Sequence, residues 1–154
     1  MAKVSAIPEG LHSVTANLTV EGAADAIAFY ARAFGAEEIT QAMDPSGKKV
    51  WHAMLRIGDS VVFINDSSPE MGTLPMPTKL WVYGEGVDAA FKRATGAGAI
   101  PGMPPTDMFW GDRTAQVTDK WGNIWMLAQH MRDMTPQEMK KAQDEFVASR
   151  QTTK

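Results

Sequence analysis

The fold is decided by residues 12–38, HSVTANLTVEGAADAIAFYARAFGAEE. Polar and apolar side chains alternate over residues 12–20, which predicts a half-buried strand. The pair Glu21-Gly22 interrupts this alternation. Helical spacing then predicts an α-helix over residues 23–34, with Gly35 as its C-cap. The apolar stripe of this helix is expected to consist of Ala23, Ile27, Tyr30, Ala31 and Phe34.

Three β-rich runs follow the predicted helix, and sharp turns separate them. We expect these strands over residues 37–43, 49–57 and 60–65. The tetrapeptide Asp44-Pro45-Ser46-Gly47 has strong turn chemistry, and Gly58-Asp59 between two β-rich runs is a hairpin signal. The first half of the chain therefore has the order βαβββ.

The second half repeats this order after residues 66–78, whose content of Pro, Ser and Gly is typical of a linker. The expected elements are a strand over 80–83, a helix over 87–97, and strands over 99–103, 113–118 and 123–129. Internal sequence similarity supports the repeat, because similar tripeptides, Ala24-Asp25-Ala26 and Val87-Asp88-Ala89, each begin a predicted helix.

These patterns predict an α+β fold made of two βαβββ modules, at about residues 11–66 and 78–130, within one domain spanning residues 1–154. The capping box Thr135-Pro136-Gln137-Glu138 further predicts a C-terminal helix over about residues 135–149. A βαβββ module has one helix to cover its sheet. Two modules that pair through their sheets would leave a concave surface suited to a small ligand. The second module can come from the same chain or from another copy, so a domain-swapped dimer is one alternative.

Composition narrows the function classes. The chain has 154 residues, is 44% apolar and 21% charged, and carries a formal net charge of −3, all within the range of globular proteins. It lacks the basic stripe that nucleic acid would require and any apolar run long enough to span a bilayer. It has no cysteine, which excludes disulfides, thiolate zinc sites and cysteine nucleophiles. The N-terminal MAKVSAIPEG does not resemble a signal peptide, so we expect a cytoplasmic protein.

Several side chains are candidates for a ligand site. His52 is a candidate catalytic acid–base group because its ordinary pKa is near neutrality, although a structural histidine is an equal alternative. Thr15 and Asn17 share the polar face of the first predicted strand and could line a pocket or face solvent. Met126 alternates with Trp125 on the last predicted strand, so we expect Trp125 in the core and Met126 at the pocket.

The run Met108-Phe109-Trp110-Gly111-Asp112-Arg113 combines aromatic and charged residues. Phe109 and Trp110 could wall a ligand, and Arg113 could hold an anionic group with its fork of N–H donors. The alternative is a loop anchored by Trp110, with Asp112 and Arg113 bonded to neighbouring loops. We expect Asp119-Lys120-Trp121-Gly122-Asn123 to be a structural hairpin turn.

Three stretches resemble the vicinal oxygen chelate superfamily, which includes glyoxalase I, bleomycin-resistance proteins and extradiol dioxygenases. They are LTVEGAADAIAFYARAFGAEE (18–38), HAMLRIGDSVVFIND (52–66) and MFWGDRTAQVTDKWGNIWMLAQH (108–130), and the AFYARAFGAEE and MFWGDR segments are most similar to its PhnB-like branch. The resemblance implies the paired-module fold, a homodimer and a pocket. It does not imply a reaction, since this scaffold carries many activities.

Metal-using members of that superfamily share four ligand positions occupied by His, Glu or Gln. The resemblance places these positions at Thr15, at Thr78 or Lys79, near Phe63 and at Met126, and none of these side chains suits a divalent cation. We therefore expect no metal and no cofactor. The favoured function is binding of a small apolar or aromatic molecule. The alternatives are a metal-dependent or His52-assisted lyase, isomerase or dioxygenase, and a dimeric accessory protein whose pocket is vestigial.

Overall fold

The computed structural model describes residues 4–151 and contains two mixed β-sheets. The first module consists of β1 (Asn17–Val20), α1 (Ala23–Phe34), β2 (Glu37–Met43), β3 (Val50–Ile57) and β4 (Ser60–Asp66). Its sheet has the order β1-β4-β3-β2, in which β1 runs parallel to β4 and the other pairs are antiparallel. The Gly58-Asp59 hairpin is confirmed, because Ile57 pairs with Ser60.

The second module repeats this arrangement. After a short 3₁₀ helix, η1 (Pro69–Met71), it consists of β5 (Lys79–Tyr83), α2 (Val87–Gly96), β6 (Ile100–Pro101), β7 (Thr106–Asp107), β8 (Asp112–Thr118) and β9 (Ile124–His130). Its sheet has the order β5-β9-β8-β6, and β7 also pairs with β8. The C-terminal helix α3 (Pro136–Gln151) completes the chain. The predicted α+β fold of two βαβββ-like modules followed by a helix is confirmed.

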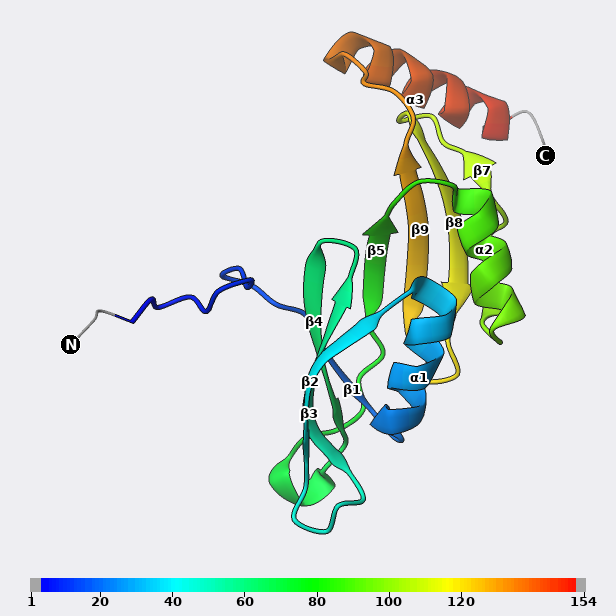
Figure 1. Ribbon diagram of the computed structural model, residues 1–154. Helices are drawn as coiled ribbons and strands as arrows, with labels where there is room; N and C mark the ends of the chain where they lie inside the picture. The colour runs from blue at the N-terminus through cyan, green and yellow to red at the C-terminus, as the bar shows by residue number, and fades with distance from the viewer. Residues whose placement is uncertain (1–3, 152–154) are drawn as a thin grey trace.

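The helices occupy distinct places around the sheets (Figure 1). Helices α1 and α2 contact each other on the same side of the two sheets, whereas α3 lies beyond the end of β9. The predicted capping box starts α3, since the Thr135 backbone N–H donates to Glu138 Oε2 at 2.7 Å and the Glu138 N–H donates to Thr135 Oγ1 at 3.2 Å. Among residues 4–151, no helix has the length and apolar content needed to cross a bilayer.

Two predicted strands are shorter than expected. The strand predicted over residues 12–20 begins at Asn17, and Val14 is 87% exposed. The last ladder bond to this segment joins the Phe63 N–H to the Ala16 carbonyl, so the alternation upstream of Ala16 has no sheet to support it. The strand predicted over 99–103 is reduced to Ile100–Pro101, because proline has no N–H for the ladder. The two-residue strand β7 was not predicted.

One apolar core joins the two modules. It contains Tyr30 from α1 and Ile64 from β4 together with Val117 and Trp125 from the second sheet. The predicted stripe of α1 is partly wrong, because Ala26, Phe29 and Ala33 are buried while Ala31 is exposed. Helix α1 packs against α2 as well as against its own sheet, so its buried surface is rotated from the face that a single sheet would cover.

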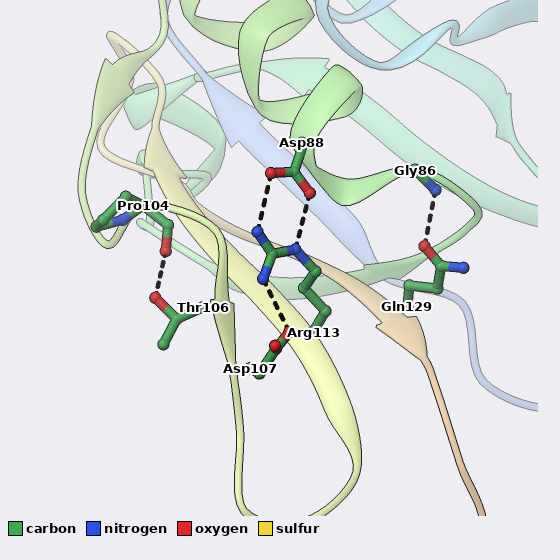
Figure 2. Close-up of polar contacts among 7 residues, drawn as sticks. All are labelled: Gly86, Asp88, Pro104, Thr106, Asp107, Arg113 and Gln129. Atoms are coloured by element: carbon green, nitrogen blue, oxygen red, sulfur yellow. Dashed lines mark hydrogen bonds and ion pairs between the residues drawn. The ribbon is translucent and has the colours of Figure 1, made fainter.

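Each module caps its helix with a side chain from its own last strand. Both N-cap residues, Gly22 and Gly86, have positive φ and bring no capping side chain. Asp66 Oδ1 accepts the N–H groups of Gly22 (2.8 Å) and Ala23 (2.9 Å). Gln129 Oε1 accepts the N–H of Gly86 at 2.9 Å, as Figure 2 shows. The similarity between the two modules that the sequence shows therefore extends to the contacts that cap their helices.

Candidate functional site

A pair of exposed aromatic rings lies on β5, on the face of the second sheet that points away from α1 and α2. We call this the helix-free face. Leu80 and Val82 pack into the core, so the alternate residues Trp81 and Tyr83 point to the helix-free face. Trp81 is 45% and Tyr83 57% exposed, and their rings are 6.2 Å apart with an interplanar angle of 19°. Two large, near-parallel rings left in solvent form a flat apolar surface.

A groove of about 490 Å³ runs beside this ring pair, between β5, the β3–β4 hairpin and the segment before β1. Its apolar lining comes from both modules: Leu11, Val14, Ala16, Ile57, Val61, Val62, Leu80, Trp81, Val82, Tyr83 and Trp125. His12, Asp59 and the Tyr83 phenol are the titratable groups in the lining. Thr15 lines the groove too, so the structure places this candidate at the site, while its contact with a ligand stays a prediction.

A buried carboxylate adjoins the ring pair on the same face. Asp112 is 5% exposed, and its Oδ2 accepts hydrogen bonds from the Tyr83 hydroxyl (2.8 Å) and from Trp110 Nε1 (3.1 Å). Its Oδ1 lies 2.8 Å from Nδ1 of His130, the residue paired with it on β9. Burial alone would raise the pKa of Asp112, but the hydrogen bonds from His130, Tyr83 and Trp110 outweigh burial and lower it.

His130 is held between two carboxylates. Its Nδ1 faces Asp112, and its Nε2 lies 2.9 Å from Oδ1 of Asp133, a fully exposed side chain in the segment before α3. The hydrogen bond with Asp112, followed by that with Asp133, raises the pKa of His130 above its ordinary value. The hydrogen bond to Asp112, together with burial, also raises the pKa of the Tyr83 phenol.

Thr114 adds an unpaired polar group to this face. It lies between Asp112 and Gln116 on β8 and pairs with Ala128 of β9, so it shares the helix-free face with Asp112. The residue is fully buried, and its Oγ1 has no hydrogen-bond partner among residues 4–151. A buried hydroxyl is normally paired, so Thr114 is an exception among the buried side chains of residues 4–151.

Arg113 points to the opposite face, toward α2 (Figure 2). Its Nε and Nη2 donate to the two carboxylate oxygens of Asp88 at 2.7 and 2.9 Å, and its Nη1 donates to Asp107 at 2.8 Å. These contacts hold the pKa of Asp88 below its ordinary value. The geometry thus favours the alternative role of Arg113, bonding to neighbouring elements, over a ligand contact.

Two further candidates lie on the first sheet. The His52 ring packs edge-on against Phe63, 4.7 Å between centroids, and within residues 4–151 it makes no hydrogen bond or ion pair. A histidine without a polar partner has nothing to set its tautomer, so this position gives no support to an acid–base role. Asn17 Nδ2 donates to Asn65 Oδ1 at 2.9 Å across the β1–β4 pair. Neither residue lines the groove described above.

The remaining candidates belong to the second module. Phe109 contacts Phe146 of α3 at 5.1 Å and Trp110 at 5.1 Å, so it anchors the helix, whereas Trp110 reaches Asp112. Met126 pairs with Trp81 and is 6% exposed, which places it under the ring pair. Trp125 is 1% exposed, so its predicted core position is confirmed. The roles of Phe109, Trp110 and Met126 in binding stay predictions.

The sequence analysis missed Trp81, Tyr83 and His130 as parts of one site. A signal existed in the stretch KLWVY, where two aromatics alternate with aliphatic residues. The grouping of His130 with Asp112 depends on strand pairing, which sequence spacing does not give. Within residues 4–151, no three His, Cys, Asp or Glu side chains are arranged to hold a metal ion. The chemistry that the arrangement offers is ring stacking beside a group that can accept or donate a proton.

Comparison with known proteins agrees with this fold. Residues 10–127 match the Glyoxalase/Bleomycin resistance protein/Dioxygenase superfamily. The chain belongs to this superfamily. An uncharacterized superfamily relative from Mycobacterium bovis is 37% identical over 141 residues, covering 84% of this chain and 91% of the relative. A second, from Mycobacterium tuberculosis strain H37Rv, is also 37% identical and covers 84% and 81% of the two chains.

Solved structures of the superfamily fold are also similar. TioX from Micromonospora sp. ML1 superposes with a TM-score of 0.66 at 25% identity, over 78% of this chain and 99% of TioX. A superfamily member from Sphaerobacter thermophilus gives a TM-score of 0.58 at 22% identity, over 77% and 98% of the two chains. A PhnB protein from Bacillus cereus gives 0.55 at 18% identity, over 77% and 99%. The last two likenesses show the fold alone.

Proposed function

We propose that this superfamily member is a cytoplasmic binding protein for a small, planar, largely apolar molecule that stacks on Trp81 and Tyr83. The observation that carries the proposal is the exposed, near-parallel ring pair at the edge of a groove lined mainly by apolar side chains. Ring stacking and the removal of apolar surface from water would supply the binding free energy. The scarcity of charged lining residues favours a neutral ligand.

The spacing of the rings restricts how a ligand lies. Carbon atoms in contact are about 3.5–4.0 Å apart, so a ring inserted between two others needs about 7 Å. The ring centroids of Trp81 and Tyr83 are 6.2 Å apart, which leaves no room for insertion. The ligand therefore stacks on the outer side of the pair and extends into the groove toward Thr15 and His12.

Two substitutions, one at the ring pair and one away from it, test this proposal. Fused-ring aromatic compounds and their saturated counterparts would be screened by thermal shift, because a ligand that binds only the folded state stabilises it. We expect stabilisation by the planar compounds and its loss in Trp81→Ala. Met71→Ala is the control, since Met71 is 69% exposed on η1 and does not line the groove. Equal effects of both substitutions, or equal stabilisation by saturated compounds, would contradict the proposal.

We also propose that the chain forms a homodimer and belongs to the PhnB-like branch. Exposed apolar side chains, among them Ile39, Met43 and Trp51, favour a partner surface on the first sheet. Helix α3 has no buried residue among those described, which leaves room for a contact with a second copy. Light scattering after size-exclusion chromatography at micromolar concentration would test the dimer, and a monomeric mass would contradict it.

A further inference from the structure

A histidine–carboxylate pair, His130 on β9 and Asp112 on β8, lies in the same sheet as the ring pair on β5. Tyr83 connects the two places, because its ring is part of the stacking surface and its hydroxyl donates to Asp112. Asp112 in turn contacts His130 through its other carboxylate oxygen. Tyr83, Asp112 and His130 project from the same face of the sheet, so a molecule that stacks on Tyr83 lies on the face that carries the pair.

The contacts fix the protonation of His130. An ionised carboxylate can only accept, so the hydrogen bond between Asp112 Oδ1 and Nδ1 requires the proton to be on Nδ1. Asp112 is held in place by the Tyr83 hydroxyl and Trp110 Nε1, which orients the imidazole in turn. In this tautomer Nε2 is the nitrogen that exchanges protons.

The Asp133 carboxylate covers Nε2 of His130 and can move away from it. The contact of Nε2 with Asp133 needs the imidazolium form, because a neutral ring with the proton on Nδ1 has a lone pair at Nε2. When His130 loses its proton, Asp133 and that lone pair repel each other. Since Asp133 is fully exposed, its side chain can turn into solvent and uncover Nε2.

We propose that Asp112 and His130 form an acid–base dyad, in which Nε2 takes a proton from an O–H or acidic C–H group of the molecule stacked on Trp81 and Tyr83. The inference rests on the proposed function, which supplies the bound molecule. The proton moves from the ligand to Nε2, the electron pair stays on the ligand as an enolate or alkoxide, and the same proton or a solvent proton is returned. No oxidant, reductant or metal enters this step.

The charges around the dyad fit this assignment. The charged groups around His130 are Asp112 from β8 and Asp133 from the segment before α3, and the Tyr83 phenol adjoins them from β5. Their negative charge disfavours an anionic ligand and favours a neutral one that gives up a proton.

The probe is 2-indanone, a planar aromatic ketone with acidic C–H bonds, in D₂O. Loss of its α-proton NMR signal would be followed with the protein, and its binding would be measured separately by thermal shift. We expect exchange in the wild type to be faster by about 100-fold than in His130→Gln or Asp112→Asn. Asp144→Asn, a surface substitution on α3, should leave the rate unchanged.

A second measurement needs no ligand. The Cε1 proton of His130 would be titrated by NMR in the wild type and in Asp112→Asn. We expect a pKa above the ordinary histidine value in the wild type and a lower pKa in the variant, because the carboxylate that stabilises the imidazolium is gone. Circular dichroism would establish that the variant is folded.

The outcomes separate the two proposals. Binding of 2-indanone without exchange, or exchange that survives His130→Gln, would overturn the dyad and leave the binding function intact. An unchanged His130 pKa in folded Asp112→Asn would also overturn the dyad. Failure of 2-indanone and of every other planar compound to bind would instead contradict the proposed function.

Discussion

The Tyr30 hydroxyl donates a 2.7 Å hydrogen bond to Oδ2 of Asp119, a residue 89 positions further along the chain. The bond joins α1 of the first module to the β8–β9 hairpin of the second. Asp119 is 1% exposed and also accepts the indole N–H of Trp125 at 2.9 Å and the backbone N–H groups of Trp121 and Asn123. A buried carboxylate with this many donors is structural, as the hairpin-turn interpretation predicted.

Removal of this bond should destabilise the protein. We expect Tyr30→Phe to lower the free energy of unfolding by about 1–2 kcal/mol, because the hydroxyl's bond to the buried carboxylate and the bond that it accepts from Asn123 Nδ2 are lost. Asp119→Asn should cost about 3 kcal/mol or more, because its amide cannot accept all of the donors that converge there. Urea denaturation measures both, with Asp144→Asn on the surface of α3 as the control. Equal costs for Asp119→Asn and Asp144→Asn would show that the network is unimportant.

Gly111 should be intolerant of any side chain. It has a φ of +96°, and a Cβ at this position would lie 2.6 Å from the Arg132 carbonyl oxygen. Gly47 has a φ of +70° with nothing within 4 Å, so it is a control that isolates the backbone cost. We expect Gly47→Ala to cost about 1 kcal/mol and Gly111→Ala clearly more, since the chain leading to α3 must move. Urea midpoints of the two variants would show the difference, and similar values would refute the clash.

Arg113 should support the fold and not the ligand. Lysine cannot reproduce the paired contacts to the two oxygens of Asp88, so Arg113→Lys should lower the thermal midpoint. Affinity for any planar ligand found in the screen should stay the same, because Arg113 faces α2. Thermal shift with and without ligand reports both quantities. Weaker binding in this variant would support the anion-holding role that the sequence suggested.

The contribution of the Asp112–His130 pair to stability should depend on pH. Because the pKa of His130 is raised, its contribution to stability is complete below pH 6.5 and disappears as the pH rises through the raised pKa. Because the pKa of Asp112 is lowered, its contribution to stability is present above pH 3.8 and disappears as the pH falls through the lowered pKa. The pair therefore stabilises most between these two ordinary values.

The measurement compares the wild type with His130→Gln. The difference in their free energies of unfolding should be largest at about pH 5 and should decrease as the pH rises through the raised pKa of His130. A difference that does not change with pH would mean that the ion pair contributes nothing to folding.

Local patterns in the sequence were enough to identify the fold. The change from alternating to helical spacing at Gly22 located α1, and Gly58-Asp59 located the β3–β4 hairpin, because turn chemistry and periodicity act over a few residues. The capping box at Thr135 located the start of α3 for the same reason. The upstream limit of β1 was wrong, since a strand needs a partner and no ladder bond to the sheet reaches residues 12–15.

These local sequence patterns could not predict which residues form the candidate site. Only strand register brings Asp112 beside His130, and only the packing of β5 leaves Trp81 and Tyr83 exposed. Arg113 shows the same limit, because its face of β8 is set by the position of α2. Short-range propensities determine which elements form, whereas the contacts that make chemistry join residues far apart in the chain, and these are decided when the two modules fold together.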